Sequence, residues 1–245
     1  MNDSIEYQIV TENIASGIEP QLRFLDGGVP VWNFIILLVA IVLMLLNRNL
    51  FAQRFSTMLK MMFQPSDAMK MTREWNPAES VNGISALVVY VGLLSFILQK
   101  TVLAYTNNSI LFGGIGFYKD VCMFIITYLI LQHLGITFFG WLFGFKAAAA
   151  RHEALHVSAI AAMDTIMIVI AMVVIFYPAK IILVIAVAII MILTCIRVIK
   201  SFFEIQILTK MNLFQNFLYF CTLEIVPLSI AVTMMIRLIV SGCVL

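Results

Sequence analysis

Long runs of apolar residues alternate with short polar stretches along the chain after residue 30. A helix needs about 20 mostly apolar residues to cross a hydrocarbon core of about 30 Å. We expect each long run to be a membrane-spanning helix, because a helix satisfies its own backbone hydrogen bonds where water is absent. The expected spans are residues 31–46, 84–105, 117–139, 155–177, 179–199 and 213–240.

The loop between the first two expected spans, residues 47–82, contains an amphipathic pattern. One side of the helix it predicts is polar, with two cations that would lie near anionic headgroups. We expect this helix to lie in the inner interface; the alternative is that it packs against a soluble partner. The apolar positions are Phe51, Phe55, Met58, Leu59 and Met62, and the polar ones are Gln53, Arg54, Ser56, Thr57 and Lys60.

These patterns predict an all-α fold: a polytopic membrane helix bundle of about six transmembrane helices, plus one interfacial amphipathic helix. Residues 1–30 form an acidic tail, which we expect outside the cytoplasm and uncleaved, because no basic stretch precedes the first apolar run. Residues 31–245 form the transmembrane helical domain.

Composition supports a membrane setting, since 62% of the 245 residues are hydrophobic and 11% are charged. Soluble domains have about 45–50% apolar and 25% charged residues, and a soluble fold of this size could not hide the excess. The net charge of +2 and the absence of a long basic block exclude nucleic acid as a partner. The four cysteines lie in apolar stretches and are expected to be small buried hydrophobes.

Lysine and arginine are unevenly distributed over the connections, and such residues favour the cytoplasmic side. We therefore expect both termini outside the cytoplasm. The cations assigned to the inner side are Arg48, Arg54, Lys60, Lys70, Arg73, Lys146, Arg151, Arg197, Lys200 and Lys210. Those on the other side are Arg23, Lys100, Lys119, Lys180 and Arg237.

One motif suggests an enzyme. His152, Glu153 and His156 match H-E-x-x-H, in which two histidines bind zinc and the glutamate is the general base. Leu25–Gly28 also resembles the aspartate motif of site-2-type membrane proteases. However, that family places the zinc helix before the aspartate motif, and about 30 Å of membrane would separate Asp26 from His156. We favour interfacial polar residues at the end of a turn, and expect no cofactor and no metal.

Several polar side chains fall inside the expected spans, where ionisable groups are costly and usually face the bundle interior. His133, Asp164 and Glu224 lie at inner or middle depths, with Gln132 as a neutral neighbour. They are candidates for a cluster that relays protons or holds a cation. The alternative is that each is paired separately to fix helix packing. Pro227 strengthens the Glu224 position, because it frees a backbone carbonyl one turn earlier.

Small residues recur every fourth position in the fourth span, at Ala150, Ala154, Ser158 and Ala162. This spacing lets helix backbones approach closely in membranes. Gly140 and the nearby Gly144 are expected to act in the same way. The pattern predicts packing and indicates no chemistry.

The stretch Asn216–Leu228, which contains Glu224 and Pro227, resembles the C-terminal ending of an uncharacterised domain-of-unknown-function family. That family consists of small multi-pass inner-membrane proteins from Bacteroidetes. Gly140–Lys146 and Arg197–Lys200 also fit its pattern, whereas H-E-x-x-H is not part of it. The resemblance implies a bacterial inner-membrane location and no known reaction.

Three functions are therefore open. The leading hypothesis is a non-enzymatic subunit or assembly partner of a cell-envelope complex, bound to other membrane proteins or to further copies of itself. The second is a small proton- or cation-coupled transporter or channel that uses Glu224, Asp164 and His133. The third is the zinc metalloprotease.

Overall fold

The computed structural model describes residues 31–63, 80–106, 112–142, 144, 146–177, 179–209, 229 and 233. These residues form helices joined by short turns, with no strand among them, which confirms the all-α fold. Five helices are long and apolar enough to cross a membrane, so the chain has a lipid-bilayer setting. They are α2 (Val31–Leu50), α5 (Val81–Thr106), α7 (Ile115–Leu142), α8 (Lys146–Phe176) and α9 (Lys180–Thr209), and the shorter α3 is Ala52–Phe63.

Several expectations lie outside the described residues. They include the tail of residues 1–30 with Asp26, and the expected sixth span, residues 213–240, except for its positions 229 and 233. Two of the four cysteines, Cys221 and Cys243, also lie outside. Of the other two, Cys195 is exposed, so the expectation of a buried cysteine is wrong there, because this position of α9 faces away from the bundle.

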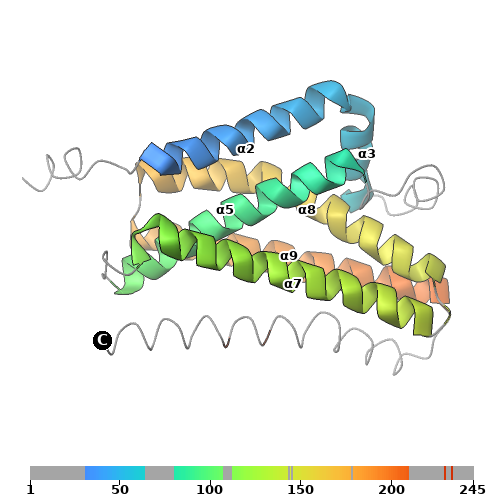
Figure 1. Ribbon diagram of the computed structural model, residues 1–245. Coiled ribbons are helices and arrows are strands. Elements are labelled where there is room, and N and C mark those ends of the chain that lie inside the picture. Colours follow the sequence, from blue (N-terminus) through green and yellow to red (C-terminus); the bar gives the residue numbers. More distant parts are fainter. Residues whose placement is uncertain are drawn as a thin grey trace, which may run out of the picture.

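Helices α5 and α8 form the centre of the bundle (Figure 1). About half of each spanning window is buried, 50% in α5 and 56% in α8, against 22% in each of α2, α7 and α9. The main hydrophobic core combines side chains from α2, α5, α8 and α9, and a smaller one joins α5 to α7. The three peripheral helices therefore turn much of their apolar surface toward lipid.

Helices α7, α8 and α9 are longer than a bilayer requires. They contain 28, 31 and 30 residues, which corresponds to about 42–46 Å at 1.5 Å per residue. Figure 1 shows their ends reaching past α3 on one side of the bundle. Helix α8 begins at Lys146 rather than at the expected Leu155, because Ala147–Ala150 are strong helix formers and carry the helix through the polar Arg151–Glu153.

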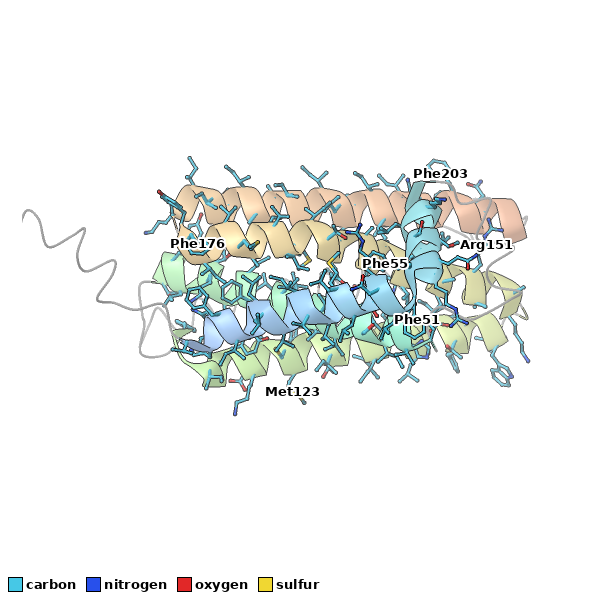
Figure 2. The ribbon with its side chains drawn as sticks, turned by 90° about the horizontal axis from the view of Figure 1, so that it is seen from above. Phe51, Phe55, Met123, Arg151, Phe176 and Phe203 are labelled. Carbon is cyan, nitrogen blue, oxygen red and sulfur yellow. The ribbon has the colours of Figure 1, made fainter. Side chains whose placement is uncertain are left out.

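Helix α3 confirms the amphipathic pattern and shows what covers its apolar side. Phe55 and Met58 are buried, whereas Arg54 and Lys60 are exposed. Met58 packs in one cluster with small side chains of α8, including Ala154. Figure 2 shows α3 crossing the bundle at a steep angle. The helix is thus a strap over α8 of its own chain.

The small residues of α8 are buried at Ala154, Ser158 and Ala162, whereas Ala150 is exposed. The predicted packing face therefore begins one turn later than expected. Gly144 does not serve close packing: its φ is +73° and no atom lies within 4 Å of where a Cβ would be. Because only glycine adopts this conformation without strain, Gly144 makes the turn between α7 and α8.

Candidate functional site

Asp164 is the one buried acidic side chain among those that the structure describes. It lies on α8, the central helix, and is 3% exposed. Its neighbours Met163 and Met167 belong to the main hydrophobic core. The Oδ1 atom has no hydrogen-bond partner among the described residues. A carboxyl group in such a place is costly and therefore marks a candidate functional position.

His133 and Glu153 form an ion pair that links α7 to α8 through Nδ1 and Oε1. The histidine side chain is 56% exposed and that of Glu153 is 13% exposed. Glu153 and Asp164 are eleven residues apart on one helix, which corresponds to about 16 Å of rise. The structure therefore places His133 beside Glu153 and not beside Asp164.

The two histidines of the H-E-x-x-H motif are enclosed by protein. His152 is 1% exposed and His156 is 7% exposed, while Glu153 is engaged by His133. No group of three metal-binding side chains occurs among the residues that the structure describes. Zinc at His152 and His156 needs a further ligand from elsewhere in the chain, so the protease stays a prediction.

The remaining candidate site residues are Gln132, which the structure describes, and Glu224 and Pro227, which it does not. Gln132 is 1% exposed on α7, and neither of its amide atoms has a described hydrogen-bond partner. Glu224 and Pro227 lie outside the described residues. A cluster that contains Glu224 is therefore still a prediction.

Sequence reasoning missed the buried polar side chains of α2 and α5. Asn47 accepts a hydrogen bond from the hydroxyl of Ser85 at 2.7 Å. The amide of Gln99 donates to the carbonyls of Phe112 and Gly114, both at 3.0 Å. Asn33 is fully buried, without a hydrogen-bond partner among the described residues. The sequence does contain a signal, because Asn33 and Asn47 share one face of α2, and every residue between them is apolar.

Aromatic rings surround the cation of Lys100, which lies near the C-terminal end of α5, the end away from the strap α3. Its Nζ lies 5.5 Å from the ring centres of Trp32 and Phe96. Trp32 in turn lies 5.6 Å from the ring of Tyr118. Cation–π contacts of this kind stabilise a charge that is partly removed from water. The arrangement is that of an interfacial aromatic belt.

A family profile described as a domain of unknown function (DUF4271) matches residues 33–235. This match covers well over half of the chain, so the protein belongs to the DUF4271 family. Comparison with curated proteins and with solved structures gives no significant match. The family places the chain among proteins of unknown function, and any specific role must be argued from its own residues.

Proposed function

We propose that this member of the DUF4271 family is a non-enzymatic subunit or assembly partner of a larger complex in a bacterial cell envelope. In this proposal it resides in the inner membrane with both termini outside the cytoplasm. The strap α3 and the long ends of α7, α8 and α9 then lie on the cytoplasmic side.

The observation that carries this proposal is an exposed aromatic surface at the long helix ends. We call it the aromatic end: Phe138, Trp141 and Leu142 of α7 and Phe203 of α9, which are 53–65% exposed. Helix α2 has 20 residues, which corresponds to about 30 Å and fills the hydrocarbon core. The ends of α7, α8 and α9 extend past α3, which follows α2 directly (Figure 1).

In this proposal the apolar side chains at the ends of α7 and α9 lie beyond the hydrocarbon core, where they lack the lipid that covers the rest of both helices. Clusters of exposed aromatic residues at such places are typical of protein contacts. The aromatic end consists of two sites, one on α7 and one on α9, and both helices pack against α8. A partner that covers both sites would therefore reach across α8. A protein seated on the cytoplasmic face of the membrane, or on a neighbouring bundle, fits this geometry.

Site-specific photocrosslinking tests the proposal in cells that express the full chain at its natural level. A photoreactive residue at Trp141 or Phe203 should capture the same protein, identified by mass spectrometry. Met123 is a matched control, because it is 62% exposed on the same helix α7 and lies toward the other end. Capture of lipid alone at all three positions would contradict the proposal.

A second candidate function is favoured by Asp164: a small proton- or cation-coupled transporter or channel. An intramembrane carboxyl group on the central helix is the kind of group that such proteins use for ion binding. Glu224 and His133 were expected to join it, and His133 instead lies beside Glu153. Asp164 is therefore the described residue on which this alternative depends.

Flux measurements in proteoliposomes test this alternative. Asp164→Asn should abolish pH-driven or cation-driven flux, because the amide cannot carry the exchangeable charge. Asp120→Asn is the control, since Asp120 is exposed on α7. If the wild-type protein shows no flux above empty vesicles, or if Asp164→Asn leaves the flux unchanged, the transporter is excluded.

A further inference from the structure

Lys100 is a cation near the end of a membrane-spanning helix. It is half-buried and lies six residues before Thr106, the last residue of α5. Its Nζ lies 5.5 Å from the ring centres of Trp32 and Phe96, and it forms no ion pair with a carboxylate in the described part of the chain. Cation–π contacts reduce the cost of removing a charge from water, but they do not neutralise it. The ammonium group is therefore available to bind an anion.

The side chain of Lys100 is held in place rather than extended toward the end of its helix. Phe96 lies one turn earlier on α5, so an ammonium group over its ring leans back along the helix. Trp32 contacts the same ammonium from the neighbouring helix α2. A lysine that only snorkels extends its ammonium group toward water instead. Two rings from two helices therefore fix the position of this charge.

The ammonium group of Lys100 lies at the level where phospholipid headgroups begin. Trp32 is the second residue of α2, and the 20 residues of this helix correspond to about 30 Å, the thickness of the hydrocarbon core. Trp32 and the ammonium group beside it therefore lie at one boundary of that core, at the end of the bundle away from α3. The anionic groups that a bilayer offers at this boundary are the phosphates of its lipids.

A second hydrogen-bond donor and an apolar surface lie beside this ammonium group. The indole N–H of Trp32 can only donate, and it forms no hydrogen bond with another residue that the structure describes. The Trp32 ring packs against the ring of Tyr118 at 5.6 Å, so α7 supports it from the side. Ile35 and Val39 follow Trp32 on the same face of α2 and are 53% and 50% exposed. They offer an apolar path from Trp32 toward the centre of the bilayer.

We propose that Lys100 and Trp32 bind the phosphate of an anionic phospholipid of the phosphatidylglycerol type, with one acyl chain lying along Ile35 and Val39. Lys100 supplies the charge, and the indole N–H of Trp32 supplies a second hydrogen bond to the phosphate oxygens. A lipid with a net negative charge is favoured over phosphatidylethanolamine, whose own ammonium group competes with Lys100 for the phosphate. This inference is independent of the proposed function, since a subunit and a transporter are both surrounded by lipid.

Lipid titration tests this site in full-length protein that has been purified in detergent and stripped of lipid. Native mass spectrometry counts the bound lipids as phosphatidylglycerol is added. Lys100→Gln should weaken the binding of the first lipid about tenfold, because a charge-assisted hydrogen bond is lost, whereas Lys100→Arg should retain it. Lys119→Gln is the matched control and should leave binding unchanged, because Lys119 is exposed near the same end of the bundle. Unchanged binding in Lys100→Gln, or equal weakening in both glutamine variants, overturns the proposal.

Two further additions to the wild-type protein test the kind of ligand. Phosphatidylethanolamine should bind more weakly than phosphatidylglycerol, because it carries no net charge. Inorganic phosphate at the same concentration should not displace phosphatidylglycerol, because it has no acyl chain to lie along α2. Equal binding of the two lipids, or displacement by inorganic phosphate, overturns the assignment to an anionic lipid.

If Lys100→Gln does not fold, Trp32→Phe decides the question. Phenylalanine keeps a ring beside the ammonium group and removes the N–H, so phosphatidylglycerol should bind several-fold more weakly to this variant. Phe34→Leu is the control for an aromatic change on α2, because the Phe34 ring packs against Phe176 of α8, and it should bind the lipid as the wild type does. Binding to Trp32→Phe that equals binding to the control would overturn the proposal.

Discussion

Amide and hydroxyl groups that are buried or half-buried connect the helices of this bundle at both ends. Gln99 ties α5 to the connection that leads into α7 through two hydrogen bonds. Asn47 and Ser85 join α2 to α5 at the other end. In a membrane such bonds matter because no water is present to replace them, although each contributes only about 0.6 kcal/mol on average.

Replacing Gln99 by leucine should lower the free energy of unfolding by about 2 kcal/mol, because the buried carbonyl of Phe112 and the partly buried carbonyl of Gly114 lose their donor. Thermal unfolding in nanodiscs measures the effect. Thr127→Val is the control: the Thr127 hydroxyl is exposed and bonds only to the carbonyl of Met123 in its own helix. If the two variants lose the same stability, the contact between Gln99 and the connection is not significant.

Replacing Asp164 by an apolar residue should raise the stability of the protein, whereas replacing Gln99 should lower it. Because its Oδ1 has no described partner, Asp164→Leu removes a desolvated polar group and should raise the Tm by a few degrees. Differential scanning fluorimetry with a thiol-reactive dye measures this change. A fall in Tm would show that Asp164 has a partner outside the described residues.

At the residue scale, the sequence correctly indicated that Asp164, a lone charge in an apolar run, is buried in the bundle. Its functional role is still a prediction. Asn33 was overlooked, since a neutral amide near a span end resembles an ordinary interfacial residue. The contact between His133 and Glu153 depends on the rotation of α7 against α8, which a single sequence does not fix.

The α7–α8 ion pair should contribute little to stability, because the His133 side chain is 56% exposed. A double-mutant cycle with His133→Ala and Glu153→Ala should give a coupling below about 1 kcal/mol, and it should shrink as salt is added. A coupling of several kcal/mol would mean that the pair is shielded from solvent by a part of the chain outside the described residues.

At the scale of elements, the helices follow from hydropathy but their ends do not. A hydropathy window stops at polar residues such as Arg151–Glu153, whereas a helix stops where its backbone hydrogen bonding is interrupted. Gly144 and the turn before Lys180 are such interruptions. The amphipathic spacing predicted α3, yet could not distinguish lipid from α8 as the surface that Met58 meets.

The packing of the strap α3 against α8 should depend on Met58, which is fully buried. Met58→Ala leaves a cavity against Ala154 of α8 and should cost about 2–5 kcal/mol of unfolding free energy. Lys60→Ala is exposed on the same helix and should change stability by less than about 0.5 kcal/mol. Equal effects would indicate that α3 rests on lipid rather than on α8.

For the whole molecule, apolar character does not decide which helix is central. The spanning window of α9 is the most apolar of the five, yet it is far less buried than that of α8. Lipid is as apolar as leucine, so hydrophobicity gives no preference for the interior of a membrane bundle. The small residues of α8 give that preference, because they let α5 approach closely. Sequence alone indicated the packing face but not its central place.

Orientation is a property of the whole chain that cysteine labelling can measure. In spheroplasts of a cysteine-free variant, Lys119→Cys should react with an impermeant maleimide, and Lys60→Cys should react only after lysis. Both side chains are exposed and one crossing helix, α5, lies between them. The opposite labelling pattern would reverse the proposed topology, which rests on the positive-inside bias.

The proposal that this chain works as a subunit is tested most directly by the mass of the particle it forms. The full chain should carry an affinity tag, be expressed at its natural level and be extracted together with the surrounding lipid. The extracted particle is then weighed by native mass spectrometry. We predict a particle in which the 27.6 kDa chain is joined by a different protein in fixed ratio, and which falls apart when Trp141 and Phe203 are both replaced by serine. A particle that contains only one chain, or only further copies of it, would contradict the account.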